Sequence, residues 1–146
     1  MKFKILAIAF LLCVLPIQAR ASELWLCNET GEDLLIAYTW PWSDGSDTWS
    51  TDGWSTVKNG KCWWAKLRYE TWFFAFLTKT GANPIYSPRD AEKTTTIKKM
   101  CVDRKQDKFR YDYKKLELVG KDCPVDSIDV SFGVQGGVND VKLTLK

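Results

Sequence analysis

Short runs of β-branched and aromatic residues, separated by turn residues, constrain this 146-residue chain more than any other feature. No long segment has the 3.6-residue period of a helix, whereas several runs alternate with the two-residue period of a strand. In one run, Leu35, Ala37 and Thr39 fall on one face, and Leu34, Ile36, Tyr38 and Trp40 fall on the other. We expect about nine strands, at 23–28, 33–40, 48–57, 62–68, 71–78, 94–102, 108–119, 126–134 and 138–145. The pattern predicts an all-β chain folded as a single antiparallel β-sandwich.

The first 21 residues have the composition of a secretory signal. A short basic start, Met1–Lys4, precedes an unbroken apolar run at 5–15, and Ala19-Arg20-Ala21 fits the A-x-A cleavage pattern. The apolar run is too short to span a bilayer as a helix. We therefore expect cleavage after Ala21, a periplasmic or secreted location, one domain over residues 22–146, and no membrane-spanning segment once the signal is removed.

The charge balance bears on the class of partner. Removal of Lys2, Lys4 and Arg20 with the signal leaves 18 basic and 18 acidic residues. A balanced charge argues against nucleic acid or an anionic membrane as the partner. Residues 22–57 contain seven acids and no base, and residues 58–121 contain sixteen bases and seven acids. The two segments form either two faces of opposite sign or pairs on folding, and we favour pairing because mixed charge is the norm on protein surfaces.

Four cysteines follow the signal: Cys27, Cys62, Cys101 and Cys123. An even number in an exported domain predicts two disulfides, and of the three possible pairings we favour Cys27–Cys62 with Cys101–Cys123. A metal site is the competing use of these cysteines, but the chain has no C-x-x-C pair and no histidine. We therefore expect neither a metal nor a cofactor. The lack of histidine also excludes Ser-His-Asp and Cys-His catalysis in their usual forms.

Several motifs taken together resemble a known family. They are Leu26-Cys27-Asn28-x-Thr30, Ala37-Tyr38, Trp49-x-x-x-Gly53-Trp54-x-x-Val57-x-x-Gly60-x-Cys62, Phe73-Phe74-Ala75-Phe76, Cys101-Val102 with Phe109, and Cys123. From residue 26 to 132 the chain resembles DUF1036, a bacterial secreted domain of unknown function, although tyrosine is expected at the doubled Phe73-Phe74. The resemblance implies a small exported bacterial domain. It supplies no established activity and therefore no catalytic residues.

All eight tryptophans lie between Trp25 and Trp72. An indole buries a large apolar area, so we expect Trp54, Trp64 and Trp72 in the core, packed against a disulfide.

Three further tryptophans, Trp40, Trp42 and Trp49, flank an acidic, turn-rich loop at 43–47. Exposed indoles beside carboxylates suit sugar binding, because the ring covers the apolar face of a pyranose while the acids accept hydrogen bonds from its hydroxyls. They also suit a protein interface, and simple packing at the base of the loop is the structural alternative. The candidate ligand-binding residues are Trp40, Trp42, Trp49, Asp44 and Asp47.

The acids in and after this loop leave two more alternatives open. Asp44, Asp47 and Asp52 faintly resemble a calcium loop but lack the spacing of an EF-hand. Two of these acids could also serve as general acid and base in a small hydrolase. Asn28-Glu29-Thr30 fits a glycosylation sequon, but we expect a tight turn there instead.

These observations favour an exported, non-enzymatic binding domain of the bacterial envelope. It would contact a protein or an envelope glycan through the tryptophan-rich loop. The alternatives are a small envelope carbohydrate-active hydrolase with paired Asp residues, and an inhibitor or immunity-type protein.

Overall fold

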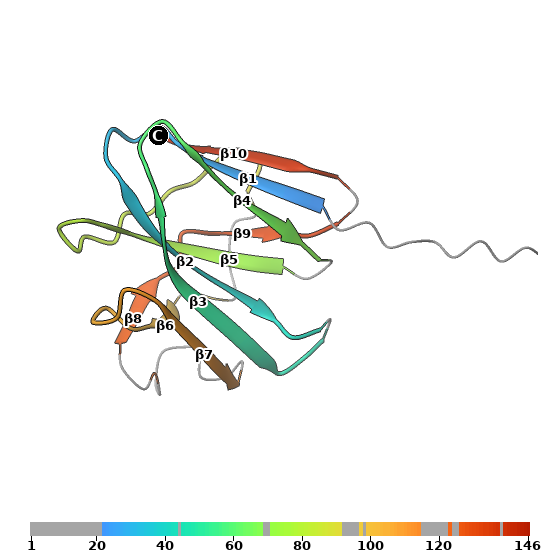
Figure 1. The fold of residues 1–146 in the computed structure, drawn as a ribbon. Helices are drawn as coiled ribbons and strands as arrows, with labels where there is room; N and C mark the ends of the chain where they lie inside the picture. The colour runs from blue at the N-terminus through green and yellow to red at the C-terminus, as the bar shows by residue number, and fades with distance from the viewer. Residues whose placement is uncertain are drawn as a thin grey trace, which may run out of the picture.

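The computed structural model describes residues 22–43, 45–68, 71–91, 97, 99–114, 123, 126–137 and 139–146. The predicted signal at 1–21 and the candidate residue Asp44 lie outside the described residues. The described part of the chain contains ten strands (Figure 1). They are β1 Ser22–Asn28, β2 Leu34–Pro41, β3 Thr48–Val57, β4 Cys62–Leu67, β5 Thr71–Thr78, β6 Lys99–Val102, β7 Phe109–Lys114, β8 Asp126–Asp129, β9 Phe132–Gln135 and β10 Val141–Leu145. Among these residues there is no helix with the length and apolarity needed to cross a membrane.

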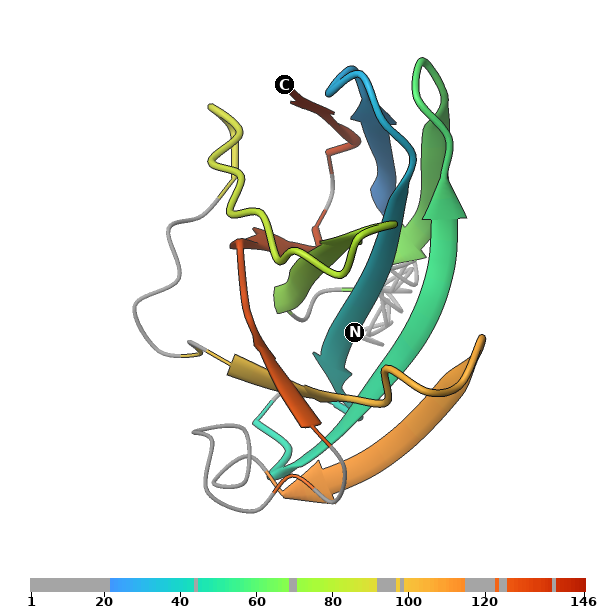
Figure 2. The ribbon, with the colours of Figure 1, turned by 90° about the vertical axis from the view of Figure 1, so that its left-hand side faces the viewer.

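The strands form three sheets. A five-stranded sheet of order β7-β3-β2-β5-β9 lies between a three-stranded sheet, β10-β1-β4, and a two-stranded sheet, β6-β8 (Figures 1 and 2). The pairs are antiparallel except for β1 with β10, which run parallel. The prediction of an all-β, sandwich-like fold is confirmed. The parallel pair and the third sheet are additions that the sequence pattern did not indicate.

Strand β5 is buried on both faces because a sheet covers each side of it. Its even positions, such as Phe74 and Phe76, lie in the core shared with β1, β4 and β10. Its odd positions, such as Phe73 and Ala75, lie in the core shared with β6 and β8. A continuous apolar run is typical of a strand without a solvent-facing side, which explains the sequence from Trp72 to Leu77.

Strand β2 has the two faces predicted from its alternation. Leu34 and Ile36 pack in the core below the three-stranded sheet, with Tyr38 and Trp40 packed against it. Ala37 packs in the opposite core. The alternation therefore places Tyr38 and Trp40 on the face of the middle sheet that also carries Trp72.

Both disulfides have the predicted pairing. Cys27 of β1 is bonded to Cys62 of β4, and Cys101 of β6 is bonded to Cys123. The first bridge joins two neighbouring strands of the three-stranded sheet, and the second ties the β6 strand to the segment that leads into β8. One bridge therefore crosslinks two strands of the three-stranded sheet, and the other crosslinks a strand of the two-stranded sheet to Cys123.

The sequon-like segment is a turn, as predicted. The buried Asn28 side chain donates hydrogen bonds to the carbonyl oxygens of Glu32 and Val57, both at 2.8 Å. Its Oδ1 accepts from the backbone nitrogen and the hydroxyl of Thr30, at 3.1 and 2.7 Å. Gly31 follows with φ at +95°, a conformation that glycine adopts without strain. Asn28 therefore fixes the chain between β1 and β2.

Two more motif residues support the core. A Cβ at Gly53 would lie 2.6 Å from a ring carbon of Phe109, so only glycine allows this ring to approach the strand. The neighbouring Trp54 is buried, packs edge-on against Phe109 and donates from Nε1 to the carbonyl oxygen of Asp103 at 2.8 Å. These positions explain part of the Gly-Trp motif by packing.

Ion pairs join the acidic first segment to the basic residues that follow it. The pairs are Asp33–Lys79 at 3.3 Å, Asp52–Arg110 at 3.6 Å and Glu29–Lys146 at 3.9 Å. The expected pairing on folding therefore describes these charges better than two faces of opposite sign. Because the lysine and arginine partners are exposed, solvent screens these pairs and each contributes little to stability.

We predict that reduction lowers the free energy of unfolding by several kcal/mol. The bridges have sequence separations of 35 and 22 residues, and each restricts the unfolded chain. In the chain-entropy account each contributes about 3–4 kcal/mol. Urea unfolding with and without reductant measures the loss, with thiol titration as the control that both bridges are open. Identical midpoints would contradict the prediction.

Candidate functional site

Three aromatic rings stack at one end of the face shared by β2 and β5. Tyr38, Trp40 and Trp72 have ring centroids 4.9 to 5.7 Å apart and interplanar angles of 12° to 24°. Trp63 of β4 lies against Tyr38, with centroids 5.0 Å apart. Trp72 is buried, whereas Tyr38 and Trp40 are half-buried. The stack thus extends from the core to the surface.

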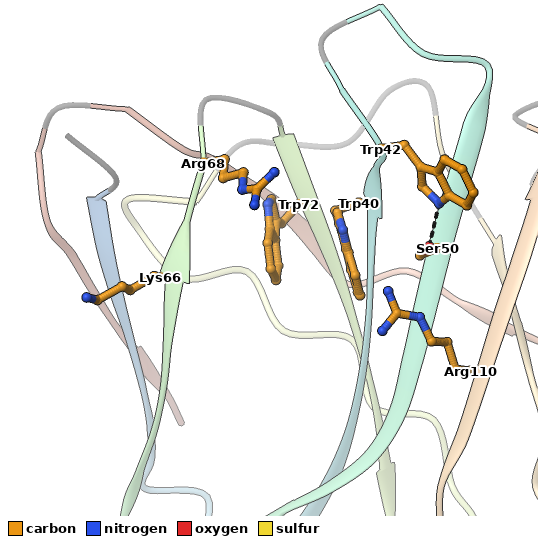
Figure 3. A pocket seen from close by; sticks show the side chains of 7 residues that line it. All are labelled: Trp40, Trp42, Ser50, Lys66, Arg68, Trp72 and Arg110. Atoms are coloured by element: carbon orange, nitrogen blue, oxygen red, sulfur yellow. Dashed lines mark hydrogen bonds between the residues drawn. The ribbon is translucent and has the colours of Figure 1, made fainter. Parts of the chain in front are cut away.

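A pocket of about 420 Å³ opens at this surface (Figure 3). It is lined by Trp40, Trp42, Ser50, Lys66, Arg68, Trp72 and Arg110. These residues come from β2, β3, β4, β5 and β7 or from the residues that follow β2 and β4. The pocket therefore depends on the assembled sheets rather than on one loop.

Trp42 is exposed yet held in a fixed orientation. Its side chain is 57% exposed, and its Nε1 donates to the Ser50 hydroxyl at 2.8 Å (Figure 3). The Ser50 hydroxyl in turn donates to the Asp112 carboxylate on β7. The backbone nitrogen of Trp42 also donates to the carbonyl oxygen of Thr48 at 3.0 Å. An exposed indole with these restraints loses little freedom when a ligand stacks on it.

A second pocket of about 500 Å³ adjoins the first. It is lined by Tyr38, Asp52, Gly53, Trp54, Ser55, Gln106, Lys108, Phe109 and Arg110. Arg110 lines both pockets. The two pockets therefore meet at the Arg110 side chain on β7.

Charges concentrate around Arg110. Its Nε lies 3.6 Å from Asp52 Oδ1, and its guanidinium carbon lies 5.4 Å from the Trp40 ring centroid. Burial raises the pKa of Asp52, Arg110 opposes the rise, and the charge of Asp112 adds to it. Burial likewise raises the pKa of Tyr38, and the Asp52 charge contributes in the same direction. Asp52 is thus a carboxyl group whose burial outweighs its ion pair.

The structure separates the predicted ligand-binding residues. Trp40 and Trp42 line one pocket, as their proximity in the sequence suggested. The prediction for Trp49 is wrong. Its side chain is 6% exposed and lies in the core on the opposite face of the sheet, with its ring centroid 5.7 Å from that of Phe73. Asp47 is exposed and is not among the described residues that line either pocket. Asp44 lies outside the described residues.

One of the three predicted core tryptophans is not in the core. Trp54 and Trp72 are buried, but Trp64 is 43% exposed. Trp64 pairs with Trp25 on the outer face of the three-stranded sheet, with ring centroids 6.3 Å apart. Because Trp63 and Trp64 point to opposite faces of β4, only one of them can reach the core.

Arg68, Arg110 and Ser50 were not among the sequence candidates. The sequence contained a weak indication for Arg110. It alternates with Phe109 and Tyr111, which face the core, so its side chain must point to the other face of the strand. Arg68 follows β4 and gave no signal, because only the packing of β4 over β5 brings it to the pocket. Among the described residues, no group of three or more Cys, Asp or Glu side chains is placed to hold a metal ion.

Comparison of the chain with protein-family models, curated proteins and solved structures finds no match.

We predict that Asp52→Asn becomes more stabilising, relative to the wild type, as the pH rises from about 4 to about 7. A raised folded-state pKa adds stability that is present below the ordinary carboxyl value of 3.8 and is lost as the pH rises through the folded pKa. Asparagine removes this dependence. Urea unfolding of both proteins across the range measures the difference.

The matched control is Asp103→Asn. A hydrogen bond from the Lys105 backbone lowers the pKa of Asp103, so its contribution is present at neutral pH and is lost as the pH falls. The control difference should therefore run in the opposite direction. A loss of stability in Asp52→Asn that grows toward neutral pH would show that attraction to Arg110 outweighs burial.

Proposed function

We propose that this protein is an exported binding domain of the bacterial envelope that binds a glycan in the pocket beside Trp42. One observation carries the proposal: an exposed indole held by Ser50 stands at the rim of a pocket whose wall is stacked aromatic rings. Such a platform offers a flat apolar surface next to polar groups. A pyranose presents the complementary pair, an apolar C–H face and a rim of hydroxyls.

The polar groups around the pocket suit a hydroxyl-rich ligand. The Asp52 carboxylate in the adjoining pocket can accept hydrogen bonds from sugar hydroxyls, and the guanidinium groups of Arg68 and Arg110 can donate them. The adjoining hollow beyond Arg110 gives room for a second sugar unit, since the two pockets measure about 420 and 500 Å³. Pockets of this size are typical of small-molecule sites.

A protein interface has less support from the same surface. A stable interface needs more than about 1,000 Å² of buried area in total, with several apolar anchors. The large exposed hydrophobic side chains of the described chain are Trp25, Trp42, Trp64 and Ile85, and of these Trp42 lines the first of the two pockets described above. The inhibitor or immunity-type alternative would need a surface of this kind.

Export and family membership belong to the same proposal. The leader-like sequence at 1–21 and two disulfides suit an oxidising compartment, either periplasmic or extracellular. The resemblance to DUF1036 is consistent with that location.

We predict that Trp42→Ala weakens glycan binding at least about tenfold, because it removes the stacking platform. A glycan array identifies the ligand, and calorimetry with the oxidised protein then measures the affinity. Trp42→Phe keeps an aromatic ring but removes the hydrogen bond to Ser50, so we expect an intermediate loss.

The matched control is Trp25→Ala, which removes an indole that is 42% exposed on the outer face of the other sheet. Both alanine variants should unfold with nearly wild-type free energy. Unchanged binding in Trp42→Ala would refute the proposed site. Capture of one protein from envelope extract, with no glycan bound, would favour the inhibitor alternative.

A second candidate function, hydrolysis of the bound glycan, is favoured by one feature near Arg110, which lines both pockets. Asp52 has a raised pKa and lies beside a second carboxylate, Asp112, with Arg110 next to both. Glycosidases divide acid and base roles between two neighbouring carboxyl groups that lie in different environments. Asp52 would act as the general acid and Asp112 as the base, which retains one of the acids expected from the sequence.

The hydrolase candidate makes its own prediction. Incubation with any glycan that binds should release new reducing ends, and Asp52→Asn should abolish the release while binding persists. Asp47→Asn, outside both pockets, is the control. Binding without product release in the wild type would exclude this candidate and leave the binding domain.

A further inference from the structure

Three cationic side chains line the Trp40–Trp72 pocket. Lys66 belongs to β4, Arg68 follows that strand, and Arg110 belongs to β7, but the Lys66 ammonium points away from the aromatic wall (Figure 3) and lies 6.0 Å from the ring centroid of Trp64 on the outer face of the sheet. In Figure 3, Arg68 lies at the Trp72 end of the pocket and Arg110 at the Trp40 end. The pocket thus has a cation at each end of its aromatic wall.

The two ends differ in how far their charge is balanced. Arg110 has Asp52 at 3.6 Å, and Asp112, across from Ser50, accepts the Ser50 hydrogen bond. Lys66 and Arg68 form no ion pair with any residue in the described part of the chain. Among the described residues, the charge of Arg68 is therefore not balanced by an ion pair.

Trp72 adds an unpaired donor at the same end. It is 9% exposed and lines the pocket, and its buried Nε1 has no hydrogen-bond acceptor among the described residues. Indole nitrogen, guanidinium and ammonium groups only donate hydrogen bonds. A wall that contains Trp72 and Arg68 is complementary to a group that only accepts hydrogen bonds. A buried donor without an acceptor is uncommon in proteins, which makes this position informative.

We infer that the glycan is an acidic one, with an anionic carboxylate or phosphate group bound by Arg68 and Trp72 Nε1 while its sugar ring stacks on Trp42. This inference rests on the glycan-binding function proposed above and names the class of sugar. Charge-assisted hydrogen bonds to guanidinium are stronger than neutral ones and often bidentate. The acidic group therefore fixes the direction in which the sugar enters the pocket.

Single-stranded nucleic acid also combines anionic groups with stacking rings. It fits this pocket less well, because Trp40 and Trp72 stack on each other at 4.9 Å instead of presenting two free faces. One free indole, Trp42, suits one ring at a time. Nucleic acid is therefore an outcome of the test and not the ligand that we propose.

The test compares matched acidic and neutral saccharides on the oxidised protein. The probes are polygalacturonate, its methyl-esterified neutral form, a sugar phosphate polymer and a single-stranded DNA oligonucleotide. We expect at least about tenfold tighter binding of an acidic saccharide than of the neutral form, with an affinity that falls as salt increases. The carboxylate and phosphate arms distinguish the two sources of the anionic group.

Variants assign the effect to the pocket. Arg68→Gln should remove the preference for the acidic form, and Arg68→Lys should retain part of it. Trp72→Phe keeps the buried ring but removes Nε1, so it should weaken the acidic probe and leave the neutral probe unchanged. Lys142→Gln, an exposed cation on β10, is the matched control and should change nothing.

The failures of the two proposals are distinguishable. Equal binding of the neutral and acidic forms, or an unchanged preference in Arg68→Gln, overturns the acidic-ligand inference and leaves the glycan-binding function intact. Tighter binding of the oligonucleotide than of every saccharide overturns the inference and the glycan class. If no saccharide on the array or in the panel binds, both proposals are wrong.

Discussion

The fold depends on the burial of β5 on both of its faces. Phe74 and Phe76 need one covering sheet, and Phe73 and Ala75 need another, so the five-stranded sheet must lie between two others. Burying a phenylalanine or leucine side chain contributes about 1.5–3 kcal/mol, so this strand supplies much of the hydrophobic stabilisation. The covering sheets are short. The three-stranded sheet covers β5, β9 and part of β2, and it leaves the β3 and β7 side of the same face for the pocket.

The incomplete cover accounts for the aromatic stack. At the end of the covered region, Trp63 is the last ring from β4 to reach the middle sheet, and Tyr38, Trp40 and Trp72 continue the packing outward. Aromatic residues suit this boundary because one side of the ring is apolar while the polar atom faces water or a ligand. The pocket therefore forms where the three-stranded sheet no longer covers the hydrophobic core, and not within a separate loop.

Predictions from the sequence were correct where they depended on a pattern within one strand or on the number of cysteines. Alternation assigned Tyr38 and Trp40 to one face of β2. The even cysteine count predicted two disulfides, and the sequential pairing that we favoured among the three possible ones is confirmed. Sequence reasoning failed for Trp49, although the alternation of Trp49 with Ser50 already implied opposite faces for them. For Arg68 no such reasoning was possible, because the contact with the pocket comes from the packing of one sheet on another. The β1–β10 pair joins the two ends of the described chain, and no local pattern encodes that.

The edge strand β7 links the recognition groups of the site. It lies beside β3 at the edge of the sheet (Figure 2). It supplies both Arg110, which lies over Trp40, and Asp112, which accepts the hydrogen bond of the Ser50 hydroxyl beneath Trp42. An edge strand has one neighbour in its sheet and is held less firmly than a central one. The orientation of Trp42 therefore depends on whether β7 stays paired with β3. A ligand that contacts Trp42 and Arg110 together would favour the paired state, so binding and order at this edge would reinforce each other.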